Sequence, residues 1–312
     1  MPKKSLRYVV TGMHRSGTTW VGRLLDSLPS QTLLNEPFNA RTGLRGVPRW
    51  YLDDRSEADT MFLETSLKRL ESGTARFKRF IGADHPPARI AAAALRGTGQ
   101  ERVYRKFMAS PHVSFFIKDP FVLRQVSTLL ARGIPTVVMV RHPAAILQSL
   151  RRMNWKMPTM LLEGREDMFG AADLENDEIA AICACWKVAY GPLLDWLTDG
   201  TDAPILLAVH EVMFEDIEGF LDDLLDFLNI TDPQDRAAGQ AFLQKTTTGS
   251  TVRPDHLRKH DISRDSSALA HAWRDAYDAQ DLATFDAMIG QEYATLCRFA
   301  VSPAFRAETL PT

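Results

Sequence analysis

The stretch RYVVTGMHRSGTTWVGRLL, residues 7–25, decides the fold. It begins with a near-continuous apolar and β-branched run that is typical of a buried strand, and from Thr18 onward its apolar residues have helical spacing. Between the two lie Gly12 and Gly17, which let the backbone turn tightly and aim its N–H groups inward. The start of the following helix adds the positive end of its dipole. A strand, a glycine loop and a helix in this order predict an anion-binding site.

The loop carries its cation in an unusual place. It keeps the GxxxxG spacing of nucleotide-hydrolysing proteins, but Thr18 stands where those proteins have the lysine that reaches the β- and γ-phosphates. Arg15 lies inside the loop instead, and its planar guanidinium suits a tetrahedral oxyanion with two adjacent oxygens. The pattern therefore disfavours an ordinary ATPase or kinase. A strand-to-helix turn that binds no ligand stays open as the alternative.

The rest of the chain repeats the alternation of strand and helix. Four further apolar runs predict buried strands at 32–34, 113–117, 136–140 and 204–209, and helical spacing is found at 18–28, 142–153 and 174–198. This predicts an α/β fold with one parallel sheet flanked by helices, whose ligands bind beyond the carboxyl ends of the strands. We expect a single domain over residues 1–312. Residues 41–110 are expected to form helices and loops inserted between two strands, as a lid or an acceptor-binding surface.

Functional side chains follow three of these runs. Arg141 directly follows the run at 136–140. Pro143 fits the first position of the next helix, which places Ser149 about two turns along that helix. Arg141 and Ser149 are therefore expected to converge on one phosphate beside the glycine loop. Lys118 follows the run at 113–117 and is expected at the same edge of the sheet.

Glu36 follows the run at 32–34 and precedes Pro37. A residue before proline is biased to an extended backbone, so we expect Glu36 to project from the tip of its strand. A carboxylate near a cationic cluster is either a structural ion pair or a general base, which must lie within about 3 Å of the proton that it removes.

Composition excludes several classes of function. The formal net charge of −2 provides no global positive field for nucleic acid or for an anionic membrane. The three cysteines form neither a CxxC pair nor a ligand cluster, so no metal site is expected. The sequence contains no run of about 18 apolar residues, so it predicts no membrane span. The first apolar run is too short for a signal peptide, so we expect a cytoplasmic protein.

Together these residues resemble the sulfotransferase family, which transfers a sulfuryl group from 3'-phosphoadenosine 5'-phosphosulfate (PAPS) and releases adenosine 3',5'-bisphosphate (PAP). TGMHRSGTTW (11–20) is similar to the family's 5'-phosphosulfate loop, and RHPAAILQS (141–149) to its 3'-phosphate element. Glu-Pro at 36–37 resembles the carbohydrate branch, and KDPF at 118–121 resembles the tyrosylprotein branch. The resemblance implies the P-loop NTPase-like sulfotransferase fold, in a soluble member of bacterial type.

The resemblance also implies roles for individual residues. The 5'-phosphosulfate would be bound by the loop residues Arg15, Ser16, Gly17, Thr18, Thr19 and Trp20. Arg141 and Ser149 would hold the 3'-phosphate, with Ser250 and Arg253 as further contacts from the polar loop at 245–253. In the tyrosylprotein branch a glutamate 21 residues after the loop arginine serves as base, and Arg15 and Glu36 have that spacing. Arg15 and Lys118 would stabilise transition-state charge without a metal.

The acceptor is expected to be a hydroxyl of a carbohydrate, a glycolipid or a small metabolite. Three alternatives stay open at this point: a small-molecule kinase with a nucleotide loop, a sulfotransferase for tyrosyl peptides, and a module that binds PAP without turnover. His14 and His142 flank the two anion-binding elements and have no partner at metal-ligand spacing, so each is expected to be a positioning or bystander residue.

Overall fold

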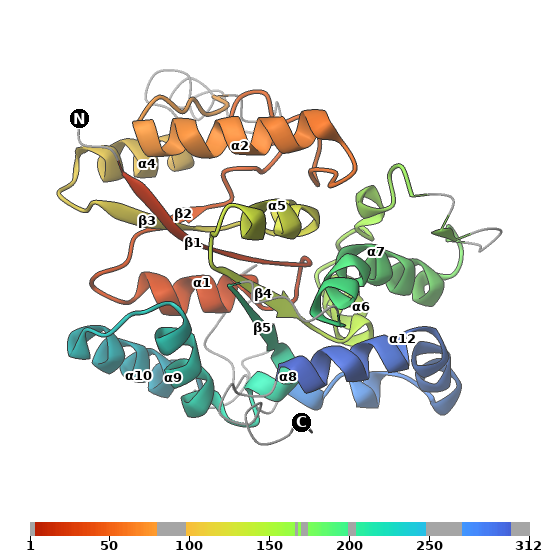
Figure 1. Ribbon diagram of the computed structural model, residues 1–312. Helices are drawn as coiled ribbons and strands as arrows, with labels where there is room; N and C mark the ends of the chain where they lie inside the picture. The colour runs from red at the N-terminus through yellow and green to blue at the C-terminus, as the bar shows by residue number, and fades with distance from the viewer. Residues whose placement is uncertain are drawn as a thin grey trace.

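The computed structural model describes residues 4–79, 98–165, 168–169, 174–198, 204–247 and 270–300. Its centre is a five-stranded sheet in which all neighbouring strands are parallel, in the order β2-β3-β1-β4-β5 (Figure 1). The strands are β1 (Ser5–Gly12), β2 (Leu33–Asn35), β3 (Ser114–Lys118), β4 (Thr136–Val140) and β5 (Ile205–Val209). All five overlap the predicted ranges, which confirms the α/β fold with one parallel sheet flanked by helices.

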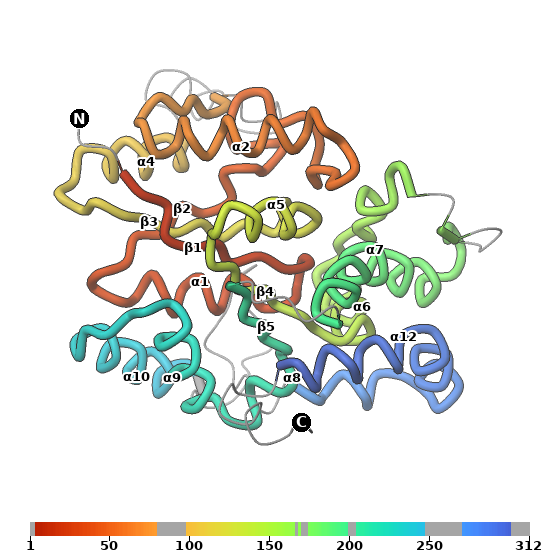
Figure 2. The backbone as a smooth tube through the Cα atoms, in the orientation of Figure 1, coloured from red at the N-terminus to blue at the C-terminus, as the bar shows by residue number. Residues whose placement is uncertain are grey.

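Helices cover both faces of the sheet (Figure 1). On one face lie α2 (Glu57–Ser72), α4 (Gly99–Ala109) and α5 (Val126–Ala131), and on the other lie α1 (Thr18–Asp26), α9 (Ile217–Phe227) and α10 (Pro233–Thr247). A third group packs beside the ends of β4 and β5 and comprises α6 (Pro143–Arg152), α7 (Glu178–Thr198) and α12 (Ala279–Phe299). The short helices are η1 (Pro120–Gln125), η2 (Thr159–Leu161), α8 (His210–Met213) and η4 (Arg274–Ala276). The backbone trace in Figure 2 shows α1 returning beside β1.

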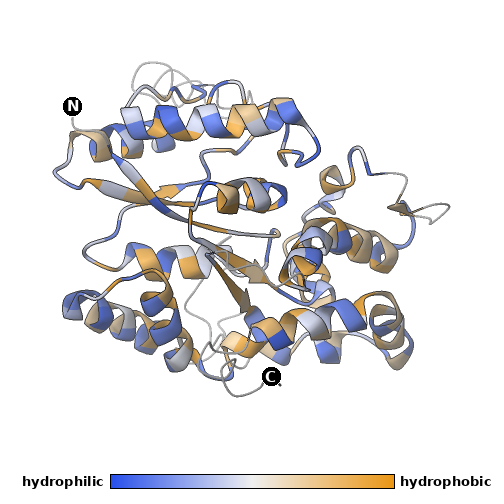
Figure 3. Ribbon diagram, viewed as in Figure 1, coloured by the Kyte–Doolittle hydropathy of each residue, from blue (hydrophilic) through white to orange (hydrophobic). Residues whose placement is uncertain are grey.

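The core consists of two apolar clusters, one on each face of the sheet. Because side chains alternate along a strand, Val9 and Ile117 join the cluster under α2 and α7, while Val10 and Phe116 join the cluster under α1 and α9. Figure 3 shows the apolar strands between helices that carry polar residues on their outer sides. Burial on both faces explains why the strands appear in the sequence as near-continuous apolar runs.

The strand register brings the predicted site residues to one edge. Val10 pairs with Lys118, and Gly12 pairs with Met139 at the end of β4. Asn35, the last residue of β2, also pairs with Lys118. The glycine loop, the end of β3 and the residue after β2 therefore meet at the carboxyl edge of the sheet, where ligands bind in open α/β folds.

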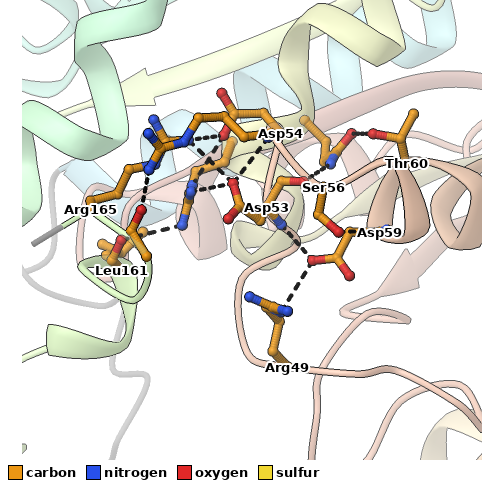
Figure 4. A network of polar contacts seen from close by, with 12 residues as sticks. Arg49, Asp53, Asp54, Ser56, Asp59, Thr60, Leu161 and Arg165 are labelled. Carbon is orange, nitrogen blue, oxygen red and sulfur yellow. Dashed lines mark hydrogen bonds and ion pairs between the residues drawn. The ribbon is translucent and has the colours of Figure 1, made fainter.

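A buried ionic network fixes the segment that follows β2 (Figure 4). Arg124 of η1 donates to Asp53 over 2.5 Å and to Asp54 over 3.3 Å, and its side chain is 2% exposed. Arg165 pairs with the same two carboxylates. Two guanidiniums thus share two carboxylates, so the segment around residue 53 is held against η1 and the chain that follows η2.

Candidate active site

The glycine loop is held by three elements. A Cβ on Gly12, whose φ is +150°, would lie 2.4 Å from the carbonyl oxygen of Met139, so the loop leaves β1 beside β4 only because this residue is glycine. The N–H of Met13 donates to the hydroxyl of Tyr190 over 2.9 Å, and that hydroxyl donates to the carbonyl of Met139 over 2.8 Å. Tyr190 of α7 therefore bridges the loop to β4.

Arg15, Arg141 and Ser149 converge, as the sequence predicts. Nε of Arg15 donates to the Ser149 hydroxyl over 2.9 Å, and Arg141 donates to the carbonyl of Arg15 over 3.1 Å. The guanidinium of Arg15 also lies 5.4 Å from the ring of Trp155. Arg15 has a positive φ of 70°, and these contacts hold that unfavourable conformation. The expected cationic cluster is thus assembled from the loop, the end of β4 and α6.

Among the described residues, the ion pair formed by these two arginines is a long one between Arg141 and Glu211. Burial, Arg141 and Arg152 lower the pKa of Arg15 to about 10. Nε of Arg141 is buried and has no hydrogen-bond acceptor among the described residues, and its carboxylate neighbour Glu211 lies 3.9 Å away. A buried guanidinium N–H that has no acceptor and lies near a second arginine fits an anionic ligand.

The start of α1 supplies further donors. Gly17 precedes the helix with φ +105° and no side-chain cap, and the first turn contains no acidic residue. The backbone N–H groups of Thr18 and Thr19, the first two of the helix, have no acceptors within it, so they are available to an anion. Trp20 differs from the expectation. Its backbone N–H donates to the carbonyl of Gly17 over 2.9 Å, and its ring packs in the core against Phe214. We therefore leave Trp20 out of the anion-binding set.

Ser16 is another member of the predicted set, and its hydroxyl is buried without a hydrogen-bond partner among the described residues. It is fully buried, and its N–H closes a turn by donating to the carbonyl of Met13 over 3.1 Å. Ser250 and Arg253 lie outside the described residues. The anion-binding set that the geometry supports is Arg15, Gly17, Thr18, Thr19, Arg141 and Ser149.

Glu36 and Lys118 form a direct ion pair at this edge. Nζ of Lys118 donates to Oε1 of Glu36 over 2.6 Å, and the other carboxylate oxygen accepts from Asn39 over 3.2 Å. The lysine side chain is 4% exposed, whereas that of Glu36 is 24% exposed and therefore reaches solvent. Burial acts to raise the pKa of Glu36, but Lys118 and Asn39 outweigh it and hold the pKa below its ordinary value. Glu36 is consequently ionised at neutral pH.

The backbone of Glu36 corrects one expectation. Its φ is +49°, in the left-handed region, and not extended as the following proline predicts. The chain turns immediately after β2: the N–H of Glu36 donates to the carbonyl of Lys118 over 2.7 Å, and the carbonyl of Glu36 accepts from Asn39 over 3.2 Å. This turn directs the carboxylate back over β3 to Lys118.

The sequence predicts His14 to be a positioning or bystander residue and gives no indication of its partner, the hydroxyl of Tyr51. Nδ1 of His14 forms a hydrogen bond with the hydroxyl of Tyr51, and its ring lies 4.9 Å from that of Phe121. Burial, then the charges of Lys118 and Arg15, lower the pKa of His14 to about 4, although Glu36 acts in the opposite direction. His14 is therefore neutral at neutral pH and adds no charge to the site.

Asp119 is the second residue of KDPF (118–121), and the resemblance implies no role for it. It is fully buried next to Lys118, and its carboxylate accepts two backbone N–H groups. Burial, followed by the charge of Glu36, raises the pKa of Asp119 to about 8, while the two N–H groups and Lys118 act to lower it.

A second polar group behind Arg141 was also missed. Glu211 of α8 accepts from the hydroxyl of Tyr293 over 2.9 Å and from the N–H of His142 over 3.3 Å. Burial raises the pKa of Glu211 despite the opposing charge of Arg141. His142 caps α6 and stacks on Trp273, with ring centroids 4.1 Å apart. Helix α12 thereby supports the end of β4 through Tyr293.

A protein-family sequence model described as "Sulfotransferase family" matches residues 8–234 of the chain. The chain belongs to the sulfotransferase family. The matched region of this sulfotransferase contains the glycine loop, the Glu36–Lys118 pair, Arg141 and Ser149. None of the curated proteins matches the chain.

Several solved sulfotransferase structures are similar to this one. The sulfotransferase domain from the Synechococcus PCC 7002 olefin synthase is 15% identical with a TM-score of 0.45, over 92% of this chain and 95% of that chain. Mouse sulfotransferase SULT7A1 complexed with PAP is 11% identical with a TM-score of 0.44, over 98% and 89%. Sulfotransferase STF1 from Mycobacterium tuberculosis H37Rv is 14% identical with a TM-score of 0.38, over 87% and 77%.

Two kinds of feature are absent from the described residues. No group of three or more His, Cys, Asp or Glu side chains is arranged there to hold a metal ion. In the same part of the chain, no helix combines the length and the apolar character that crossing a membrane requires.

Proposed function

We propose that this protein transfers a sulfuryl group from PAPS to an acceptor hydroxyl, with Glu36 as the general base. The observation that carries the proposal is the ion pair of 2.6 Å between Glu36 and Lys118, at the edge that also holds the Arg15 loop. It brings a partly exposed, ionised carboxylate and a buried cation to one anion-binding site. Membership of the sulfotransferase family gives this arrangement its reaction class.

The site fits a donor with two separate acidic groups. The N–H groups of Gly17, Thr18 and Thr19, together with Arg15, would hold the 5'-phosphosulfate at the start of α1. Arg141 and Ser149 would hold the 3'-phosphate, since both contact Arg15 and the buried Nε of Arg141 lacks an acceptor among the described residues. That 3'-phosphate distinguishes PAPS from ATP, which supports PAPS over a nucleotide triphosphate.

The reaction requires one proton transfer and one displacement. PAPS supplies the activated sulfuryl group: the acceptor oxygen forms a bond to its sulfur, and the bond from sulfur to the bridging phosphate oxygen breaks, leaving PAP with that electron pair. Glu36 takes the proton of the acceptor hydroxyl, a contribution of about 10²- to 10⁴-fold. Lys118 and Arg15 stabilise the charge that develops on the oxygens, as cations do in the related phosphoryl transfers.

The inserted segment favours an acidic acceptor. Two adjoining cavities of about 350 and 470 Å³ share Arg45 and Arg76 in their lining, and Arg69 lines the first of them. The second cavity is lined by residues of α4, the helix from which Gln100 donates to the carbonyl of Glu36 over 3.1 Å. Arginines recognise carboxylates and sulfates in a bidentate way. We therefore propose a hydroxyl-bearing carbohydrate or metabolite with an acidic group as the acceptor class.

Transfer of radiolabel from ³⁵S-labelled PAPS into a pool of cell-extract metabolites and glycans tests the function. The wild-type chain should label an acceptor, and Glu36→Gln should reduce the labelling rate by at least about a hundredfold. Glu163→Gln, which changes an exposed carboxylate, is the matched control and should retain the wild-type rate. Label in tyrosyl peptides would shift the acceptor to that class. PAP binding with no transfer to any pool would replace the enzyme by a binding module.

A further inference from the structure

Asp119 connects the two halves of the proposed catalytic pair. It directly follows Lys118, the last residue of β3, and its Oδ2 accepts the N–H of Phe38, two residues after Glu36, over 2.6 Å. Its Oδ1 accepts the N–H of Phe121 over 2.9 Å and so caps η1. The side chain is completely buried. One carboxylate thus joins the turn that carries Glu36 to the strand that carries Lys118.

The backbone of Asp119 is fixed as firmly as its side chain. Its N–H donates to the carbonyl of Val10 over 2.9 Å, and its carbonyl accepts from the hydroxyl of Thr11 over 2.8 Å. Both partners belong to β1, the strand that leads into the glycine loop. The carboxylate is therefore anchored to the centre of the sheet.

We propose that Asp119 is a positioning residue that holds Glu36 in reach of Lys118. The inference rests on the proposed function, because it assigns Asp119 a purpose through the base. Asp119 fixes the chain on the far side of Pro37, while the bond of 2.7 Å from the N–H of Glu36 to the carbonyl of Lys118 fixes it on the near side. The turn is thereby held at both ends against β3.

The conformation of Glu36 requires such a hold. A non-glycine residue at φ +49° is unfavourable and persists only where surrounding contacts determine it. The following proline adds its own preference for an extended residue at this position. Without the bond between Asp119 and Phe38, the turn relaxes toward the extended backbone, which takes the carboxylate away from Lys118.

Only a carboxylate satisfies both N–H groups. Its two oxygens are both acceptors, whereas the side chain of an asparagine has one acceptor and one donor group. In Asp119→Asn, only one of the two N–H groups can keep an oxygen acceptor, and the NH₂ would face the other, donor against donor at a fully buried position. Asp119→Asn therefore breaks the simultaneous hold on Phe38 and Phe121 at nearly constant volume.

The experiment compares Asp119→Asn with Asp216→Asn in the full chain at about pH 9, where Asp119, whose pKa burial raises to about 8, is mostly ionised. Asp216 also caps a helix through one backbone N–H, at the exposed start of α9, and serves as the matched control. We expect Asp119→Asn to lower kcat about tenfold to a hundredfold, with the KM for PAPS within about twofold, since small misplacements of reacting groups cost this much. The double variant Asp119→Asn/Glu36→Gln should be little slower than Glu36→Gln alone, because both changes act through one group.

Crystal structures supply a readout that does not depend on activity. In Asp119→Asn the distance from Lys118 Nζ to Glu36 Oε1 should become longer than that of a hydrogen bond, and in Asp216→Asn it should stay near the 2.6 Å of the wild type. An unchanged distance with wild-type kcat would overturn the proposal even if the protein transfers sulfate. A wild type without transferase activity would defeat the proposed function, while the distance would still decide the role of Asp119.

Amide hydrogen exchange covers the case in which Asp119→Asn does not fold. In the wild type, the N–H of Phe38 should exchange as slowly as the N–H groups of β3, because its acceptor is a buried carboxylate. Exchange of Phe38 at the rate of an exposed loop would show that Asp119 does not hold the turn, and would overturn the proposal.

Discussion

Arg141 donates a hydrogen bond of 3.1 Å to the carbonyl of Arg15, which brings two guanidiniums from distant parts of the matched region to one place. The charge of Arg141 lowers the pKa of Arg15, so the two cations are close enough to repel each other, and an anion bound beside them would relieve that repulsion. This relationship connects the loop after β1 with the end of β4. The two motifs that the sequence suggested for separate acidic groups are therefore neighbours.

The first prediction concerns selectivity for the 3'-phosphate. Arg141→Ala should weaken PAP binding about tenfold to a hundredfold, because a charge-assisted hydrogen bond contributes about 1.5–3 kcal/mol. Binding of AMP, which lacks the 3'-phosphate, should change little. Isothermal titration calorimetry with both nucleotides measures the difference, and Arg132→Ala at the end of α5 is the control. Equal losses for PAP and AMP would remove Arg141 from this role.

The second prediction concerns the space beside Lys118. A Cβ on Gly22 of α1 would lie 3.0 Å from Cγ of Lys118, so Gly22→Ala should displace the lysine stem and lower kcat about tenfold. The control is Gly191→Ala in α7, where a Cβ meets nothing within 4 Å. That variant should only gain the helix propensity of alanine, about 0.8–1.0 kcal/mol. Steady-state kinetics and urea unfolding measure the two effects, and full turnover in Gly22→Ala would contradict the close fit.

The third prediction concerns pH. The pKa of Asp119 is raised to about 8 by burial and by Glu36, with Lys118 and the two N–H groups opposing, and Tyr51 lies nearby. Its doubly accepting carboxylate form is therefore complete only above about pH 8, so kcat should fall as the pH drops through that value. The carboxylate of Glu36, whose pKa is lowered, stays ionised over this range. A kcat profile across neutral and alkaline pH should show this step in the wild type and lack it in Asp119→Asn.

The same raised pKa has a consequence for stability. The folded chain binds this proton more tightly than the unfolded chain, whose carboxyl keeps the ordinary value of 3.8. The contribution of Asp119 to stability is therefore complete below about pH 4 and is lost as the pH rises toward 8. Urea unfolding at mildly acidic and at alkaline pH should show a smaller loss of stability with pH in Asp119→Asn than in the wild type. Identical pH dependence of the two proteins would contradict the raised pKa.

The fifth prediction concerns the ionic network behind η1. Arg124→Ala leaves the buried Asp53 and the partly exposed Asp54 with Arg165 as their ion-pair partner and should destabilise the fold by about 3–5 kcal/mol. Arg151→Ala breaks an exposed pair with Glu178 and should cost at most about 1 kcal/mol. Urea unfolding of both variants gives the comparison. A loss for Arg124→Ala no larger than that for Arg151→Ala would show that the network does not hold this segment.

The sequence was sufficient for the fold and for the residues at the strand ends. The five strands could be predicted because burial on both faces leaves continuous apolar runs, and Lys118 and Arg141 follow from their positions at the ends of two of them. The left-handed backbone of Glu36 could not be predicted, because tertiary hydrogen bonds overcome the local preference that proline imposes.

The supporting residues depend on contacts between distant positions. Asp119 bonds to Phe38 across 81 residues, Tyr190 to Met13 across 177, and Tyr293 to Glu211 across 82. Each pair becomes visible only when the sheet is assembled, since one member lies in a helix or turn without any motif of its own. His14 and Tyr51 are a further case, because the loop position of His14 gives no indication of a hydroxyl partner.

The most direct test of the central claim is a thermal-shift measurement of the wild-type chain with PAP, AMP and Mg-ATP at equal concentrations. A ligand that binds only the folded state raises the unfolding temperature by an amount that grows with its affinity. The account predicts a clear rise in Tm with PAP and a much smaller rise with AMP, because Arg141 and Ser149 are proposed to bind the 3'-phosphate. Stabilisation by Mg-ATP with no effect of PAP would contradict it.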